Sequence, residues 1–310
     1  MTEKNKIGII IFVIATLFLL TLIFSTIVGF IASGESIPSD TNTIIIPIHG
    51  IITTESSTGL FDDTTTSSRD IANEIEKAGL NPNIKAIIFD INSPGGSGVA
   101  AEEIANAIQN LNKTTVSYIR DIGTSAAYWI ASSTDKIYAS RFSFTGSVGV
   151  ISSYIEIHGL LENFNLTHRR LVAGEYKDIG SPLKEMTQAE QIIWQNKLNS
   201  MQNIFAEEVK KNRKLTDEQL KEIKTAMIYT GTEAKELNLI DDFGGRKEAI
   251  EYITKKIGKP CIPYESRKKT TILSMIMGST TTNNAFYQIG RGIGSSLGSS
   301  IGSNQKIVGV

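Results

Sequence analysis

The sequence predicts an α/β domain with a parallel sheet, preceded by a single membrane-spanning helix. Two observations support this fold class. Between residues 44 and 139, short apolar segments alternate with segments of helical periodicity, as in chains whose parallel strands are connected by helices. An uncharged apolar stretch, residues 7–32, precedes this alternation.

The uncharged stretch is long enough to be a membrane anchor. A helix needs about 20 apolar residues to cross a bilayer, whereas the apolar part of a cleaved signal peptide usually has about 7 to 15. We therefore expect residues 7–32 to form a retained helix, although the small residues Ala32, Ser33 and Gly34 would also suit a cleavage site.

The charges around this stretch predict its orientation. Lys4 and Lys6 precede it, while Glu35 and Asp40 follow it. Because lysine is enriched on the cytoplasmic side of membrane helices, the protein should lie in a cell membrane with most of the chain outside the cytoplasm. The predicted segments are a cytoplasmic amino terminus (1–6), an anchor (7–32), a linker (33–43), a folded domain (44–265) and a Gly/Ser-rich tail (266–310).

The folded domain should begin with a buried strand that ends in a turn at His49 and Gly50. A capping box formed by Thr187 and Glu190 predicts the start of one long helix. The expected strands are 44–48, 84–91, 115–119 and 136–139, and the expected helices are 71–78, 100–111, 126–132, 187–213, 231–237 and 246–257.

The tail supports two interpretations. Glycine, serine, threonine and asparagine dominate it, as in disordered segments. Apolar residues nevertheless recur every fourth position, at Ile289, Ile293, Leu297 and Ile301, which is typical of a helix that orders on a membrane or a partner chain.

Composition excludes several classes of function. The 31 basic and 32 acidic side chains nearly cancel, so no basic surface for nucleic acid is expected. Cys261 is the only cysteine, which excludes an intrachain disulfide and a cysteine-based zinc site. We expect neither a metal nor a cofactor.

Adjacent glycines mark the first candidate for chemistry. Gly95 and Gly96 lie between a predicted strand and a predicted helix, in a turn over residues 92–96. Their backbone N–H groups could hold a developing oxyanion. A phosphate-binding loop is the rival interpretation, but the Walker lysine spacing and the G-x-G-x-x-G pattern are missing, and a plain turn is the simplest alternative.

Ser125 is the candidate nucleophile. It lies among small residues, from Gly123 to Ala127, where a predicted strand meets a predicted helix. Small neighbours let a peptide backbone approach a hydroxyl, and a helix amino terminus favours negative charge. An ordinary helix-capping serine is the alternative interpretation.

A serine hydroxyl needs a base. None of the three histidines, His49, His158 and His168, lies in a motif that suggests this role. Lys177 lies in a loop between Gly174 and Pro182. A lysine acts as a base only in its neutral form, which burial favours.

Together, these motifs resemble the signal peptide peptidase A family, membrane serine proteases with a Ser/Lys dyad. The resemblance covers roughly residues 44–265 and implies a Clp protease/crotonase-like fold, in which ββα units repeat along a superhelix. The matching motifs are Asn92–Gly96, Ser125–Trp129, Thr145–Val150, Tyr176–Asp178 and Tyr229–Asp241.

The resemblance implies a role for each site residue. Ser125 would attack the peptide carbonyl, and Lys177 would accept its proton, with Ser147 orienting the lysine amine. The oxyanion hole would consist of the N–H groups of Gly96, Gly95 and Ala126. The family commonly has two glycines where this chain has Ala126 and Ala127, so the extra methyl groups should affect specificity more than mechanism.

The resemblance also implies a substrate and an assembly. The substrates would be extended peptides with small or apolar side chains, such as cleaved signal peptides. The protein would form a homo-oligomeric ring in which neighbouring subunits supply the serine and the lysine of one site.

Three alternatives remain open: a protease of the same dyad that cuts a membrane partner protein, as stomatin-specific proteases do, a Clp-like Ser-His-Asp protease, and a catalytically inactive scaffold of crotonase-like fold. The Clp-like alternative needs a histidine about 25 residues after the nucleophile, where this chain has Val150. A membrane-anchored serine endopeptidase is the function we expect.

Overall fold

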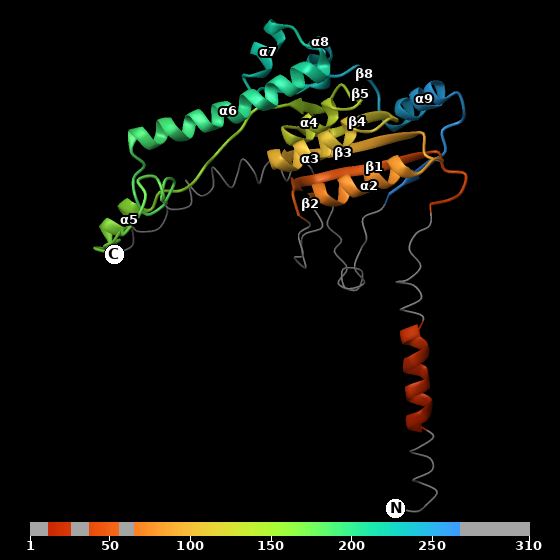
Figure 1. Ribbon diagram of the computed structural model, residues 1–310, viewed down its shortest axis with the longest axis horizontal. Coiled ribbons are helices and arrows are strands. Elements are labelled where there is room, and N and C mark those ends of the chain that lie inside the picture. Colours follow the sequence, from red (N-terminus) through yellow and green to blue (C-terminus); the bar gives the residue numbers. More distant parts are fainter. Residues whose placement is uncertain (1–11, 26–36, 56–64, 267–310) are drawn as a thin grey trace, which may run out of the picture. The chain divides into compact units, whose positions relative to one another are not determined.

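The computed structural model describes residues 12–25, 37–55 and 65–266, in two units that divide after Thr41 (Figure 1). In the first unit, residues 12–25 form a helix whose side chains are all exposed. Within the described residues, no helix combines the length and the apolar character needed to cross a membrane. The rest of the predicted anchor and nearly all of the predicted tail lie outside the described residues, so both remain predictions.

The second unit is built on one sheet, to which the described residues contribute nine strands. Six of them follow the order β2-β1-β3-β4-β5-β8. All pairings are parallel except that between β6 and β7. The strands are β1 (Thr43–Thr53), β2 (Thr65–Ser67), β3 (Ala86–Gly96), β4 (Thr114–Thr124), β5 (Lys136–Ala139), β6 (Phe144–Gly146), β7 (Ile228–Thr230), β8 (Asp242–Phe243) and β9 (Pro263–Glu265).

The helices confirm the predicted α/β alternation. Each of the six predicted helices is present, with ends that shift by up to three residues. The helices of this unit are α2 (Ser68–Leu80), α3 (Gly98–Gln109), α4 (Ala126–Ser132), α5 (His158–Asn163), α6 (Gln188–Arg213), α7 (Asp217–Ile223), α8 (Gly231–Glu236) and α9 (Arg246–Ile257).

Both faces of the sheet are covered, which explains why its strands are almost continuously apolar. On one face, a large buried cluster joins the strands to α2, α3 and α4. On the other face, a smaller cluster joins Ile45, Ile88 and Val116 to α9 through Ala249 and Ile253. Successive side chains of a strand point to opposite faces of the sheet. Alternate residues of β1 and of its neighbouring strands therefore belong to the two clusters, and only one set faces α9.

Two predicted turns are wrong. β1 does not end at His49 but continues to Thr53, with a bulge at Gly50, whose φ is 71°. Residues 92–96 are also extended and form the end of β3. Both segments remain strands because they pair with each other, His49 opposite Asn92 and Ile52 opposite Gly96.

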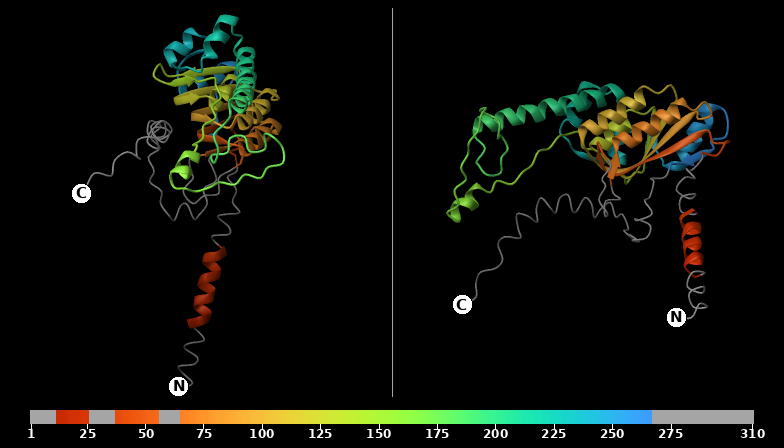
Figure 2. Two further views of the ribbon diagram at one scale, coloured as in Figure 1. Left: turned by 90° about the vertical axis from the view of Figure 1, so that its left-hand side faces the viewer. Right: turned by 60° about the horizontal axis from the view of Figure 1, so that its bottom comes forward.

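The long helix α6 begins with the predicted capping box of Thr187 and Glu190. Its carboxyl-terminal half packs on α4, where the rings of Phe205 and Trp129 stack with centroids 5.0 Å apart. Its amino-terminal half projects beyond the sheet and carries the segment 151–187 (Figure 2).

Candidate active site

The register of three parallel strands brings Gly95, Ser125 and Ser147 together. Ser93 of β3 lies opposite Gly123 of β4, so the positions two residues later, Gly95 and Ser125, are also neighbours. A Cβ atom on Gly95 would lie only 2.8 Å from the Cβ of Ser125. β6 follows on the other side of β4, with Thr124 opposite Gly146. These three predicted site residues therefore belong to one cluster at the carboxyl ends of the strands.

Ser125 has a backbone conformation that is unusual for a serine. Its φ and ψ are 54° and −126°, a sparsely populated combination for residues with a side chain, which costs roughly 1–3 kcal/mol. Although it precedes α4, its hydroxyl makes no capping hydrogen bond. Its N–H donates to the carbonyl of Gly146 at 2.9 Å. The helix-capping interpretation is therefore unsupported, and the hydroxyl is not engaged in holding the helix.

The two glycines differ in their surroundings. Gly95 is buried with a φ of 106°, and its N–H donates to the hydroxyl of Ser93 at 3.1 Å. Gly96 is exposed and packs so closely on β1 that an added Cβ would lie 2.1 Å from the carbonyl oxygen of Ile52. Because the Gly95 amide already has an acceptor, Gly96 and Ala126 are the stronger candidates among the predicted oxyanion donors.

Ser93 has a role that was not predicted from the sequence, where it is one residue of the motif Asn92–Gly96. It is fully buried, and its hydroxyl donates to the carbonyl of Gly50 at 2.5 Å while accepting the Gly95 N–H. It thus connects the bulge of β1 to the glycine beside Ser125. The signal that could have identified it is a hydroxyl two positions before a glycine pair, at the end of a buried strand.

Ser147 follows β6 with a φ of 53°. Its N–H donates to the carbonyl of Met227 at 2.8 Å, just before β7. The adjoining Gly146 needs to be a glycine, because its φ is 81° and an added Cβ would lie 2.6 Å from the ring of Tyr229. The antiparallel pair β6–β7 therefore holds Ser147 in the row that contains Ser125.

Lys177 does not belong to the cluster around Ser125. It is exposed, and within the described residues its ammonium makes no hydrogen bond or ion pair. Its segment is attached to the amino end of α6, where Lys184 pairs with Glu190. A helix rises about 1.5 Å per residue, so this end lies roughly 27 Å from Phe205, which contacts α4. Within one chain, Lys177 and Ser125 are not brought together.

The residue after Lys177 is strongly paired. The guanidinium of Arg170 donates two hydrogen bonds to the Asp178 carboxylate. These hydrogen bonds, more than any other influence, lower the pKa of Asp178 to about 2. Lys184 lies 3.8 Å from the same carboxylate, so ionic contacts order a segment that has few buried side chains.

The histidines do not supply a base to Ser125. His49 lies on β1 with its Nε2 3.4 Å from the Oδ1 of Asp90, and His158 begins α5 beside Glu156. His168 is exposed. Among the residues that the structure describes, no group of three or more histidine, cysteine and acidic side chains could hold a metal ion.

Comparison with known proteins identifies the family. Residues 107–258 match the model of peptidase family S49. The chain is 29% identical over 243 residues to a putative protease of Methanocaldococcus jannaschii, covering 76% of each chain. It is 27% identical over 221 residues to a putative signal peptide peptidase SppA of Enterococcus faecium, covering 70% of this chain and 64% of that protein.

Among solved structures, a membrane-bound stomatin-specific protease aligns with a TM-score of 0.47 and 13% identity, over 74% of this chain and all of that one. The family match includes Ser125, Ser147 and Lys177, and the related proteins extend the similarity over most of the folded domain. Residues 107–258 of this chain are therefore a peptidase family S49 domain, and the chain is a serine peptidase.

Proposed function

We propose that this chain is a membrane-anchored serine endopeptidase that uses Ser125 as its nucleophile and Lys177 as its general base, and that degrades cleaved signal peptides or similar apolar peptides. The observation that carries the proposal is the conformation of Ser125. A serine held at a φ of 54°, without a capping hydrogen bond and against a glycine, has its hydroxyl available for attack.

The proposed reaction is an acyl transfer. The Ser125 Oγ bonds to the scissile carbonyl carbon while its proton passes to the neutral Lys177 amine. The oxyanion accepts hydrogen bonds from the N–H groups of Gly96 and Ala126, and from Gly95 if it exchanges its present acceptor, Ser93. Lys177, oriented by Ser147, then protonates the leaving amine, the C–N bond breaks, and water hydrolyses the acyl-enzyme.

A second subunit would supply the base. Lys177 is exposed and has no partner among the described residues, and the segment 151–187 exposes several large apolar side chains, among them Ile151, Phe164 and Leu171. Contact with another protein chain would remove these apolar side chains from water, which is favourable. A head-to-tail ring would place this segment against the Ser125 cluster of the neighbouring subunit and would exclude water from the lysine.

Three further observations support the membrane anchor, the fold and the substrate class in this proposal. The helix of residues 12–25 lies within the uncharged stretch 7–32, which supports an anchor with the protease domain on the extracytoplasmic side. The parallel sheet with helices on both faces supports the Clp protease/crotonase-like architecture. The name of the Enterococcus faecium relative supports signal peptides as the substrate class.

Mixing two inactive variants tests the shared site. Ser125→Ala and Lys177→Ala should each abolish hydrolysis of an apolar reporter peptide by the detergent-solubilised full chain. Co-expression of the two variants should restore activity, because a Lys177→Ala subunit keeps its serine and a Ser125→Ala neighbour keeps its lysine. Random assembly would restore about a quarter of the sites in a ring with head-to-tail interfaces.

The control is co-expression of Lys177→Ala with the double variant, which provides no intact lysine and should stay inactive. Activity in either single variant would contradict the dyad. Two inactive single variants and an inactive mixture would leave the dyad in place but contradict its division between subunits. Peptide profiling on membrane extracts would then distinguish signal peptides from a specific membrane partner protein.

A further inference from the structure

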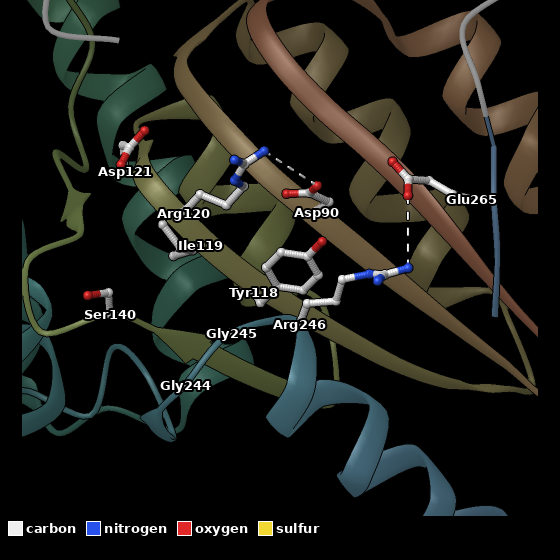
Figure 3. A pocket seen from close by; sticks show the side chains of 10 residues that line it. All are labelled: Asp90, Tyr118, Ile119, Arg120, Asp121, Ser140, Gly244, Gly245, Arg246 and Glu265. Carbon is white, nitrogen blue, oxygen red and sulfur yellow. Dashed lines mark ion pairs between the residues drawn. The ribbon is translucent and has the colours of Figure 1, made fainter. Parts of the chain in front are cut away.

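A second polar site lies on the opposite face of the sheet. A cavity of about 530 Å³ is lined by residues from β3, β4 and the amino end of α9, and Ser125 is not among them (Figure 3). It begins where the apolar cluster beneath α9 ends. Beyond Ile88 and Tyr118, the next residues on this face of β3 and β4 are Asp90 and Arg120.

Asp90 is buried without a full set of partners. It is 6% exposed, and its Oδ1 makes no hydrogen bond within the described structure. The nearest cation-forming group, Nε2 of His49, lies 3.4 Å away and likewise makes no hydrogen bond. The other carboxylate oxygen, Oδ2, lies 4.0 Å from Arg120, so Asp90, which lines the cavity, keeps acceptor capacity for a donor from outside the chain.

The guanidinium groups of Arg120 and Arg246 line the same cavity, and neither is within hydrogen-bond distance of its nearest carboxylate. Arg120 lies 4.0 Å from Asp90, and Arg246 lies 3.9 Å from Glu265, distances that are too long for hydrogen bonds. Figure 3 shows Arg120 and Asp90 on neighbouring strands and Arg246 beside the ring of Tyr118. Within the described residues, both guanidinium groups keep donors for a ligand.

Tyr118 adds a neutral donor between these charges. Tyr118 is 5% exposed, and burial, followed by the charge of Asp90 and a hydrogen bond to its carboxylate, raises the pKa of the Tyr118 hydroxyl. Gly244 and Gly245, just before α9, complete this wall and bring the amino end of the helix to the cavity. The N–H groups of a helix amino terminus favour an anion.

The signs of the charges select the class of ligand. A simple anion would satisfy the two arginines but would leave Asp90 without a donor and would approach the Asp90, Asp121 and Glu265 carboxylates. A simple cation would satisfy Asp90 and be repelled by the two arginines. A ligand with an ammonium group and a carboxylate satisfies both, and a cavity of this size is within the range of small-molecule sites.

We propose that this cavity binds a small zwitterion, an α-amino acid or a short peptide with free ends, whose ammonium group contacts Asp90 and whose carboxylate contacts Arg246 and Arg120. The site is separate from the proposed catalytic cluster and does not depend on the assignment of the dyad. Its ligand has the chemistry of a peptidase product, so a purified peptide is the appropriate probe.

The experiment is a calorimetric titration of alanyl-alanine into the full-length Ser125→Ala variant, which removes the hydroxyl proposed to attack peptides. We expect saturable binding that weakens at least tenfold when either end of the dipeptide is blocked, by acetylation or by amidation. Arg246→Gln and Asp90→Asn should each weaken binding of the free dipeptide at least tenfold. The matched control is Lys247→Gln, which removes an exposed charge from the next residue of α9 and should leave binding unchanged.

Other outcomes would overturn the proposal. Binding that is insensitive to both Arg246→Gln and Asp90→Asn would place the dipeptide elsewhere, for example beside residue 125. Inorganic phosphate that binds as tightly as the dipeptide and competes with it would show a site for simple anions. Should Asp90→Asn fail to fold, Arg246→Gln still decides the result, because the Arg246 side chain is half exposed. Hydrolytic activity of the unmutated chain, measured separately, tests the proposed function independently.

Discussion

The cluster around Ser125 and the segment around Lys177 differ in almost every physical property. The first lies at the ends of β3, β4 and β6, where backbone hydrogen bonds and close glycine contacts fix each residue. The second, residues 151–187, is mostly exposed and is ordered by ion pairs. A single chain therefore preorganises the proposed nucleophile but does not bring the proposed base to it.

After removal of the dyad itself, the largest expected effect comes from filling the space beside Ser125. Gly95→Ala would place a Cβ 2.8 Å from the Cβ of Ser125 and force alanine to a φ of 106°, so we expect peptidase activity to fall at least about 100-fold. Gly98→Ala is the matched control, because nothing lies within 4 Å of its added Cβ. Similar losses in both variants, measured as kcat/KM, would show that the close contact at Gly95 is unimportant.

The pH dependence of peptidase activity tests the proposed base, Lys177. If a neutral amine is the base, activity should rise with pH, by about tenfold per unit while the lysine is mostly protonated. The measurement is kcat/KM of the assembled protein between about pH 6 and 10. A flat profile over this range would contradict a lysine base and would leave the preorganised serine without its proposed partner.

A smaller effect should follow from loosening the strand beside the nucleophile. Ser93→Ala removes the hydroxyl that connects Gly50 to Gly95, and we expect kcat to fall about tenfold with little change in KM. Ser132→Ala is a suitable control, because Ser132 is about equally buried but its hydroxyl donates to the Trp129 carbonyl at the carboxyl end of α4. Equal effects of the two substitutions on kcat would mean that Ser93 acts only on stability.

The smallest effect concerns acid. Pairing with Arg170 lowers the pKa of Asp178 to about 2, below its ordinary value of 3.8. The stabilising contribution of this ion pair is therefore complete above about pH 3.8 and is lost as the pH falls toward 2. Between pH 5 and 2, hydrogen exchange at Gly174–Asp178 should accelerate, after correction for intrinsic rates, more than exchange at Gly123–Ser125. Arg170→Gln should loosen the segment already at pH 5, and equal protection of the two regions at every pH would contradict this contrast.

Sequence patterns predicted the centres of β1, β3 and β4 but not their carboxyl ends, predicted β5 with its observed bounds, and missed the short strands β2, β6, β7, β8 and β9. Apolar runs such as Ile87–Ile91 require burial in any fold, whereas the following Asn92–Gly96 has the composition of a turn. It stays extended because β1 and β4 pair with it, and those contacts are distant in sequence. The same reason explains why the role of Ser93 was missed, since its acceptor, the Gly50 carbonyl, is placed by a bulge in another strand.

The candidate site was predictable to the extent that local sequence determines it. Small residues around Ser125 and the glycine pair indicated the cluster that the structure brings together. The capping box of Thr187 and Glu190 predicted α6, but no local pattern shows where that helix holds Lys177 relative to Ser125. The roles of Ser125, Lys177, Ser147 and the oxyanion donors therefore remain predictions for the experiments above.

The antiparallel contact between β6 and β7 has a consequence for biosynthesis. Ser147 donates to the Met227 carbonyl, and Ser125 donates to Gly146 immediately before Ser147. A nascent chain that has not yet reached residue 227 therefore lacks one wall of this cluster. The order of translation itself would keep a newly made peptidase harmless until nearly its whole folded domain has been synthesised.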